Sequence, residues 1–390
     1  MLGGAVSYLI GRKSKTVRDY AVWAFAAAEF AIAVFLTAAA YEGSIASASI
    51  AEICGMGLSF KLDGFRALYV LISSFMWLAA SIFSKEYLHE ERNRNRYYFF
   101  WMVTLGATAG VLLSADLYTT FIFFEMMSFT SFVWVIQEEK KESIHAGNLY
   151  LGIAVISGLT MLMGVFMLYH EIGTLAMSEI SAGIAAKKAL SAAAGTEAAL
   201  EARLFTSGCL MLVGFGAKAG IFLLHVWLPK AHTSAPAPAS AILSGVLTKM
   251  GIFGILVLTG TMFRGSEAWG MLLLVFGMLT MLVGAFLALF STHFKRTLAC
   301  SSISQMGFIL VGISMFALLK SNTLAINGAL LHMLNHSLIK LVLFLVAGVI
   351  FMKTESLDLN EIRGYGRNKP LLHLAFGIGA FSIAGIPLGS

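Results

Sequence analysis

Four ionisable side chains near the middle of long apolar stretches of this sequence could do chemistry. Glu125 is part of LYTTFIFFEMMSFTSFVWVIQ, and the other three are the lysines Lys218, Lys249 and Lys340. A charged side chain at the centre of a bilayer costs at least ~2.5–3.5 kcal/mol, so such residues are rare and mark paths for ions or protons. Together, these four residues predict a path that conducts protons or other cations.

Two histidines precede Lys340 at helical spacing in LLHMLNHSLIKLVLFLVAGVI. His332, His336 and Lys340 recur every four residues, which places them along one face of a helix. Because imidazole titrates near neutral pH, this row is typical of a proton relay. A zinc site is the alternative for the histidines, although the sequence shows neither HExxH nor an evident third ligand. Lys340 could also extend its ammonium towards the membrane surface.

Glu125 and Lys218 carry opposite charges, and a purely structural ion pair is one interpretation of them. We favour a gate. At an effective dielectric constant of ~20, moving a glutamate from about 8 Å to about 4 Å of a lysine is worth roughly 2 kcal/mol. A small helix movement would therefore change how firmly Lys218 holds its proton.

The stretch that contains Lys218 reads GFGAKAGIFLLHVWLPKAHTSAPAP, and Pro229 interrupts its helical pattern. Non-helical backbone at membrane depth persists only inside protein or beside a wet cavity. We therefore predict a broken helix that admits water to Lys218; a loop leaving the membrane is the alternative. A second break is predicted at Pro387. Further polar residues near these sites are auxiliary candidates: His225, Lys230, His232 and Gln305.

The elements that hold these residues must be membrane helices. The chain is 58% hydrophobic and 12% charged, whereas soluble domains average about 25% charged residues. Since about 20 apolar residues span a bilayer, eleven runs qualify, and the apolar stub at 1–11 makes twelve. We expect an all-α polytopic membrane protein with spans at roughly 21–40, 67–84, 98–115, 117–137, 147–169, 204–228, 239–263, 268–291, 297–319, 325–352 and 371–390.

The loops give an orientation and two longer connections. Lys and Arg concentrate in the loops after the odd-numbered spans, which predicts that these loops are cytoplasmic and that the N-terminus is outside. Residues 41–66 are mixed and Gly/Ser-rich, as expected of a connection on the outer surface. Residues 170–203 are rich in Ala, Lys and Glu, which favours an amphipathic helix, also outside. The net charge of +6 is mostly this bias and does not indicate nucleic-acid binding.

No cofactor motif is visible. Cys54, Cys209 and Cys300 lie far apart and form no CxxC or Cys/His pattern, so we expect no iron–sulfur or zinc site. Phosphate-binding and dinucleotide-binding fingerprints are also missing from the sequence. Any redox chemistry must therefore belong to a partner chain.

Several stretches resemble one membrane-protein family: HVWLPKAHTSAPAPASAILSGVLTKMGIFGIL, FFEMMSFTSFVWV, CSSISQMGFILVGIS, HMLNHSLIKLVLFLVAGVI and SLDLNEIRGYGRNKPLL. They are similar to the antiporter-like subunits of respiratory complex I, of membrane-bound nickel–iron hydrogenases and of Mrp sodium/proton antiporters. The resemblance covers nearly the whole chain. It implies a fourteen-helix fold with two inverted five-helix repeats and with breaks in helices 7 and 12. The corresponding divisions are 1–97, 98–263 and 264–390.

The resemblance also implies roles for individual residues. Glu125 would be the fifth-helix glutamate, Lys218 its seventh-helix partner, and Lys249 the eighth-helix lysine that links two half-channels. His336 would be the eleventh-helix histidine, with Lys340 beside it and His332 one turn earlier. Gln305 replaces a histidine that is frequent in the tenth helix. The sequence stops inside the twelfth helix, so we expect it to be a piece of a longer chain, with a naturally split subunit as the alternative.

Three functions follow from this resemblance. The first is a proton-translocating subunit of a complex I-like or hydrogenase complex in the cell (inner) membrane. Its energy would come from a hydrophilic redox arm, with quinone, Fe–S or NiFe centres in partner subunits. The second is a Na⁺/H⁺ antiporter subunit of an Mrp-type complex. The third is a scaffold subunit with an inactive channel.

Overall fold

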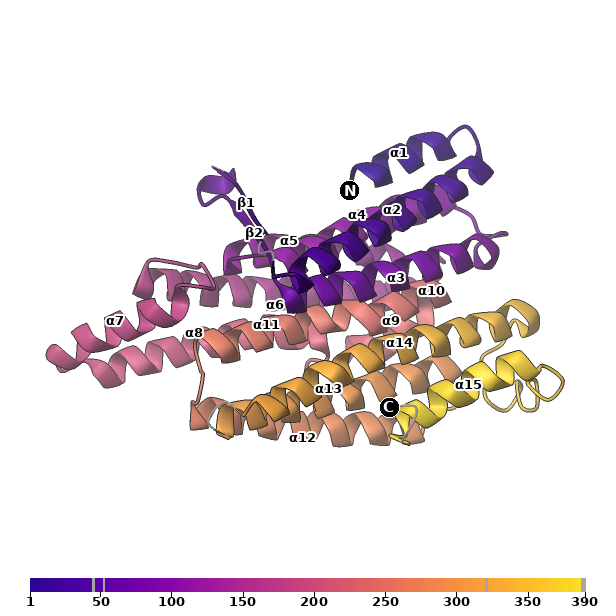
Figure 1. Ribbon diagram of the computed structural model, residues 1–390. Coiled ribbons are helices and arrows are strands. Elements are labelled where there is room, and N and C mark those ends of the chain that lie inside the picture. The colour runs from indigo at the N-terminus through magenta and orange to yellow at the C-terminus, as the bar shows by residue number, and fades with distance from the viewer. Residues whose placement is uncertain (44–45, 52, 320–321, 387–390) are drawn as a thin grey trace.

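The protein is a bundle of long helices that run roughly along one axis (Figure 1). We describe a computed structural model, in which residues 1–43, 46–51, 53–319 and 322–386 are described. The helices are α1 (Leu2–Gly11), α2 (Lys15–Tyr41), α3 (Gly64–Tyr87), α4 (Arg94–Leu113), α5 (Leu117–Val135), α6 (Lys141–Ile172), α7 (Ile180–Ala193), α8 (Glu197–Ala219), α9 (Trp227–Ser234), α10 (Ala237–Ile242), α11 (Thr248–Thr261), α12 (Glu267–Leu289), α13 (Phe294–Leu318), α14 (Thr323–Thr354) and α15 (Pro370–Ile383).

Each of the twelve predicted runs contains a helix, which confirms the all-α membrane fold. Eight described segments are long and apolar enough to cross a bilayer by length and composition alone: α2, α3, α6, α8, Ala237–Thr261, α12, α13 and α14. Polar residues mark several helix starts. Ser14, Asp63 and Asp116 each accept a hydrogen bond from a backbone N–H of the first turn.

The connection at 41–66 contains regular structure that its composition did not predict. Strands β1 (Ala46–Ile50) and β2 (Leu58–Leu62) form an antiparallel hairpin, and a short 3₁₀ turn (Ile53–Gly55) lies between them. The Ser59 carbonyl accepts a hydrogen bond from the N–H of Ala115 at 2.8 Å, which fixes the hairpin to the start of α5. The predicted helix within 170–203 is confirmed as α7, at the same end of the bundle (Figure 1).

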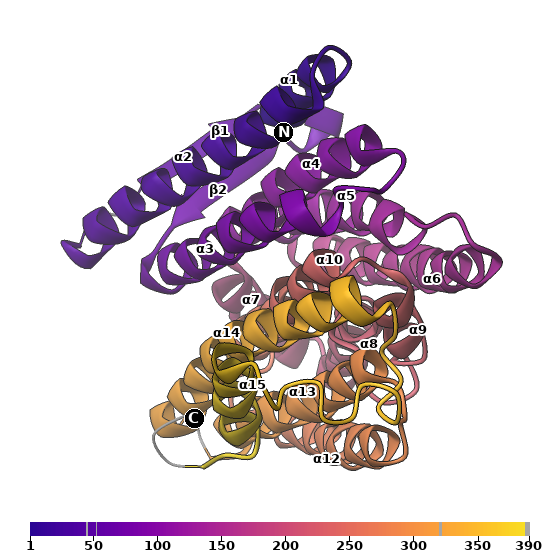
Figure 2. The ribbon, with the colours of Figure 1, turned by 90° about the vertical axis from the view of Figure 1, so that its right-hand side faces the viewer.

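The bundle has a buried centre and a lipid-accessible periphery. The stretch Ala237–Thr261 is almost wholly buried, whereas α2 and α12 are mostly exposed. Seen down the bundle, α1–α5 gather on one side and α12, α13 and α15 on the other, with α10 and α14 between them (Figure 2). Because α10 and α11 lie at the centre of the bundle, Lys249 lies between the two groups of helices.

The seventh span is interrupted as predicted, but the interruption begins well before Pro229. Helix α8 ends at Ala219, and Gly220 turns the chain with a φ of 75°. Leu223 also has a positive φ, 72°, a conformation that costs energy for a residue with a side chain. Pro229 lies in the first turn of α9, where its missing N–H would have no helical partner in any case. The second predicted break, at Pro387, lies outside the described residues.

The eighth span contains an irregularity that sequence periodicity did not predict. Between α10 and α11, residues Leu243–Leu247 form a π-helical turn. Such wide turns are rare and occur often at functional sites. This one ends two residues before Lys249, so it sets the direction in which that lysine leaves the helix.

Candidate functional site

Lys218 lies in the last turn of α8 and is 5% exposed. Its ammonium donates hydrogen bonds to Ser128 Oγ at 2.9 Å and to Tyr150 Oη at 2.6 Å. The Tyr150 ring also lies beneath it, with the centroid 4.8 Å from Nζ. The positive charge is therefore held by neutral hydroxyls and an aromatic face.

Glu125 lies one turn before Ser128 on α5, on the same side of that helix. Its carboxylate packs against α6 at Gly158, where an added Cβ would lie 2.4 Å from Oε1. It acts electrostatically on Lys218, but the two form no ion pair among the described residues. The predicted water-bridged contact between Glu125 and Lys218 therefore stays a prediction.

Tyr150 connects Lys218 to the far side of the helix break. Its hydroxyl lies 2.6 Å from Ser131 Oγ, and its ring packs edge-on against Trp227 with centroids 4.8 Å apart. Trp227, the first residue of α9, donates from Nε1 to the Ala217 carbonyl of α8 at 2.8 Å. Tyr150, Trp227 and Ala217 help to line a cavity of about 10 Å³ beside Lys218, which is about the space of one water molecule.

Lys249 is fully buried in the first turn of α11. Its ammonium donates to the Ser244 carbonyl at 2.6 Å and lies 2.6 Å from His336 Nδ1. The π-helical turn makes the first contact possible, because the carbonyl of Ser244 faces a side chain five residues later. Ser244 also bonds through Oγ to Ser302 Oγ of α13 at 2.6 Å. Lys249 thus joins α11, α13 and α14.

The predicted row on α14 is confirmed as one polar face. The rings of His332 and His336 lie 6.4 Å apart, and Nε2 of each is buried without a hydrogen-bond partner among the described residues. Lys340 donates to the Leu298 carbonyl at 2.8 Å and to Ser301 Oγ at 2.5 Å. Because Lys340 is fully buried, its ammonium does not extend to the surface. No group of three His, Cys, Asp or Glu that could hold a metal occurs in the described chain.

The auxiliary candidates separate into buried and exposed groups. His225 is buried in the break and stacks on Phe222 with centroids 6.2 Å apart, while Gln305 is buried on α13. Lys230 is exposed on α9 and makes none of the contacts above. His232 is fully buried, stacks on Phe344 at 5.0 Å, and has no hydrogen-bond partner at either ring nitrogen within the described part of the chain. It therefore belongs to the centre of the site.

Lys295 is a fourth buried lysine, which we placed in a loop from the sequence. It is the second residue of α13, is 4% exposed, and donates to the Ala235 carbonyl at 2.7 Å. Its neighbours in HFKRTLAC are of mixed polarity, so hydropathy alone placed it outside the span. The only available signal was that His293 caps the helix directly before it.

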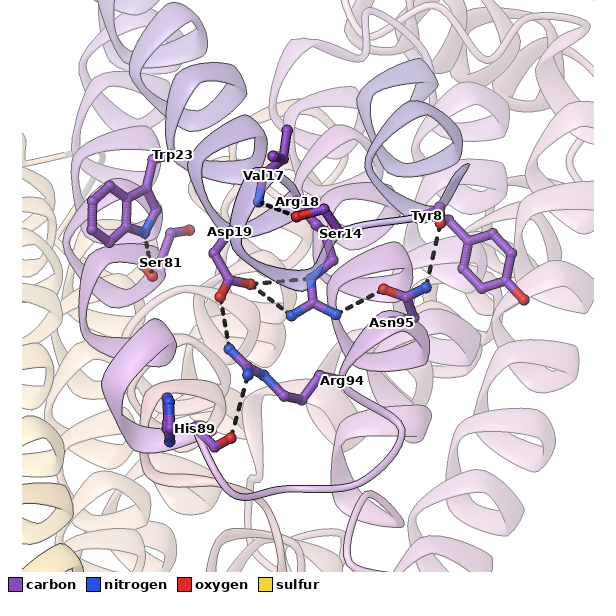
Figure 3. A network of polar contacts seen from close by, with 10 residues as sticks. All are labelled: Tyr8, Ser14, Val17, Arg18, Asp19, Trp23, Ser81, His89, Arg94 and Asn95. Atoms are coloured by element: carbon purple, nitrogen blue, oxygen red, sulfur yellow. Dashed lines mark hydrogen bonds and ion pairs between the residues drawn. The ribbon is translucent and has the colours of Figure 1, made fainter. Parts of the chain in front are cut away.

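A second group of buried charges lies between α2 and α4, also from residues that we assigned to loops (Figure 3). Asp19 accepts hydrogen bonds from Arg18 and from Arg94, each at 2.7 Å. Arg18 also donates to Asn95 Oδ1 at 2.7 Å and lies over the ring of Tyr98. The two arginines and Asp19 are each at most 7% exposed. This arrangement fastens the N-terminal helices to α4.

These features define the class: a multi-pass helical membrane protein with a broken seventh span and buried lysines linked through polar side chains. The chain belongs to the family described as NADH:quinone oxidoreductase/Mrp antiporter, TM, which matches residues 114–390. The suspected family resemblance is thereby confirmed.

Relatives come from several branches of this family. The chain is 33% identical to hydrogenase-4 component B of Escherichia coli over 85% of its own length and 49% of that protein. It is 31% identical to an NAD(P)H-quinone oxidoreductase chain 4 of Synechococcus sp., over 96% of its own length and 68% of that protein. A Na⁺/H⁺ antiporter subunit of Alkalihalophilus pseudofirmus is 28% identical, over 91% and 69% of the two chains. The chain thus spans about half the length of the first of these relatives.

Two solved structures share the fold. A chain of the Mrp complex from Dietzia sp. has a TM-score of 0.84 at 24% identity, covering 99% of this chain and 70% of that one. A chain of an archaeal membrane-bound sulfane sulfur reductase has a TM-score of 0.87 at 21% identity, covering 99% and 76%. One is described as an Mrp complex and the other as an archaeal respiratory membrane complex, and the likeness to both shows the fold of this chain.

Proposed function

We propose that this chain translocates protons as one membrane subunit of a larger complex in the cell (inner) membrane. The observation that carries the proposal is the set of buried lysines whose ammonium groups contact neutral oxygens and an imidazole nitrogen. None of Lys218, Lys249 and Lys340 forms a salt bridge with a carboxylate among the described residues, so each can release a proton without breaking an ion pair. Such groups can pass protons on, whereas a carboxylate partner would favour the charged form of a lysine and make it hold its proton more firmly.

The proposed order of transfer follows the contacts. Glu125 sets how firmly Lys218 holds its proton, and Lys218 exchanges a proton with Lys249 through water. Helices α8 and α11 lie very close together: a Cβ at Gly251 would be 2.2 Å from the Phe215 carbonyl. From Lys249 the proton passes to His336, and His332 and Lys340 continue the path.

Partner subunits must supply the energy, because no motif in this sequence holds a redox centre. A hydrophilic arm that carries quinone, Fe–S or NiFe chemistry is the source that the hydrogenase and quinone oxidoreductase relatives favour. The second candidate is Na⁺/H⁺ exchange within an Mrp-type complex, which the similarity to the Alkalihalophilus antiporter protein favours. Copurified redox subunits would support the first, and small membrane subunits alone the second.

Replacement of Lys249 tests the path. Lys249→Met keeps the side-chain length but holds no proton, and Lys249→Arg stays charged but does not release one. If Lys249 passes protons on, both variants should assemble and transport at least tenfold more slowly. The measurement is proton transport by the complex in vesicles, normalised to the amount of this subunit in the membrane. A fully active Lys249→Arg variant would show that Lys249 only supplies charge, and full activity of both would overturn the proposed path.

A further inference from the structure

Lys295 lies at the end of the bundle where α13 begins, close to the outermost polar groups of that end. Its ammonium is bonded to the carbonyl of Ala235, which directly follows α9. Lys295 therefore joins the second half of the broken span to α13. The loops 88–93, 136–140 and 355–369 lie at the same end of the bundle (Figure 1).

A line of polar contacts leads inward from Lys295 along α13. One turn further, the Leu298 carbonyl accepts a hydrogen bond from Lys340, and Ser301 accepts a second one. The next residue, Ser302, is bonded to Ser244, whose carbonyl holds Lys249. Successive turns of one helix thus connect Lys295 to the two lysines at the centre of the membrane.

His232 lies beside this line, because it is one turn before Ala235, which holds Lys295, and its ring stacks on Phe344, one turn after Lys340, with centroids 5.0 Å apart. Both of its ring nitrogens are buried without a hydrogen-bond partner in the described residues, and the charges of Lys295, Lys340 and Lys249 all act on it. A neutral imidazole can accept a proton at one nitrogen and donate from the other. His232 is therefore placed to pass protons between Lys295 and Lys340, a role that a lysine bonded to a carbonyl could not perform alone.

The water side of Lys295 carries acidic groups. Glu138, in the loop between α5 and α6, has a side chain that is 23% exposed, forms an ion pair with Lys140 at 2.8 Å, and acts electrostatically on Lys295 and on Tyr87 of α3. Glu91, in the loop before α4, is a neighbour: burial and the Glu138 carboxylate raise its pKa. Glu138 is thus a partly exposed carboxylate whose charge acts on the buried amine of Lys295.

We propose that Glu138 and Lys295 form a proton-uptake site that feeds His232 and Lys340 directly, without passage through Lys218. Glu138 accepts a proton from water and transfers it to the neutral amine of Lys295. The ammonium of Lys295 then transfers a proton to one ring nitrogen of His232, which passes a proton from its other nitrogen towards Lys340. Each step moves one proton with its charge, and no other reactant is needed. This inference rests on the proposed function. It adds the route by which protons from water would reach His232 and Lys340.

Charge replacement at Glu138 tests the site in the assembled complex. In a background with Cys54, Cys209 and Cys300 replaced by Ala, Glu138→Cys should lower proton transport at least threefold. Reaction with the anionic, membrane-impermeant sulfonatoethyl methanethiosulfonate should restore at least half of the loss. The cationic trimethylammonioethyl reagent should restore none. Glu139→Cys is the matched control, because Glu139 is 52% exposed and pairs with Arg96; neither the substitution nor either reagent should change its transport.

Three further variants keep the test decisive if the cysteine-free background is inactive. In the natural background, Glu138→Gln should lower transport at least threefold and Glu138→Asp less than twofold. Lys295→Arg preserves a donor to the Ala235 carbonyl, so it should assemble normally and still transport at least fivefold more slowly. Normal transport by Glu138→Gln and Lys295→Arg, in complexes that Lys249→Met inactivates, would overturn the uptake site alone. Normal transport by Lys249→Met as well would instead overturn the proposed function.

Discussion

Two groups of buried charges in this molecule are built on opposite principles. Between α2 and α4, two arginines share one carboxylate, with Asp19 2.7 Å from Arg18 and from Arg94. At the centre of the bundle, Lys218 and Lys249 donate to hydroxyls, a carbonyl and a histidine, and no carboxylate pairs with them in the described chain. Both groups are removed from water, so the difference lies in the partners and not in the burial.

The difference separates structure from conduction. A guanidinium does not lose its proton in proteins, and its carboxylate partner holds it in place. A lysine whose partners are neutral can exist with or without its proton, because either state leaves hydrogen bonds to the same oxygens. We therefore interpret the arginine cluster as a fixed joint and the lysines as exchange sites.

The largest effect is expected from a variant that removes the carboxylate shared by Arg18 and Arg94. Asp19→Asn leaves Arg18 and Arg94 buried without a carboxylate, and losing one member of a buried ion pair costs roughly 3–5 kcal/mol. The amount of folded subunit in membranes should fall at least fivefold, while transport per remaining complex should stay within a factor of two. Glu139→Gln removes an exposed partner of Arg96 and should cost only about 0–1 kcal/mol. Normal content with slow transport in Asp19→Asn would place this cluster in the ion path.

Composition and periodicity predicted the helices well because a bilayer allows few alternatives. Each predicted span contains a helix, and the family resemblance indicated where the seventh one breaks. The break was predicted near 214–229, and the chain leaves the helix within that range, at Gly220; Pro229 itself is tolerated in the first turn of α9. The hairpin β1–β2 was missed because its strands, ASASI and LSFKL, are short and only one of them is partly buried.

The sequence pointed to most of the candidate residues, but it did not predict the contacts that join them. Glu125, Lys218, Lys249 and His336 stand out as polar residues in apolar runs. Lys295 and Asp19 do not, because they lie at helix starts where loop charges are expected, and only tertiary packing buries them. The bond between Lys249 and the Ser244 carbonyl also needs the π-helical turn, which no spacing rule in the sequence reveals.

A smaller effect sharpens the comparison at Lys218. Glu125 influences this lysine without an ion pair, so Glu125→Gln should leave assembly near normal, unlike Asp19→Asn. Proton transport should fall several-fold, because the neutral amide no longer shifts the proton affinity of Lys218. Transport in vesicles and subunit content should be measured on the same preparations. Normal transport by the assembled variant would remove Glu125 from the gate, and loss of assembly would make it a structural residue.

The smallest effect concerns the hydroxyl that holds Lys218. Tyr150→Phe keeps the ring against Trp227 and removes one of the two side-chain acceptors of the ammonium. A net hydrogen bond is worth about 0.5–1.5 kcal/mol, so transport should change two- to tenfold, with two- to threefold expected because Ser128 still accepts. Ser128→Ala alone should behave similarly. If either hydroxyl can replace the other in holding the Lys218 ammonium, the fold-loss of transport in the double variant should exceed the product of the two single fold-losses. A fold-loss equal to that product would show that each hydroxyl acts on Lys218 independently.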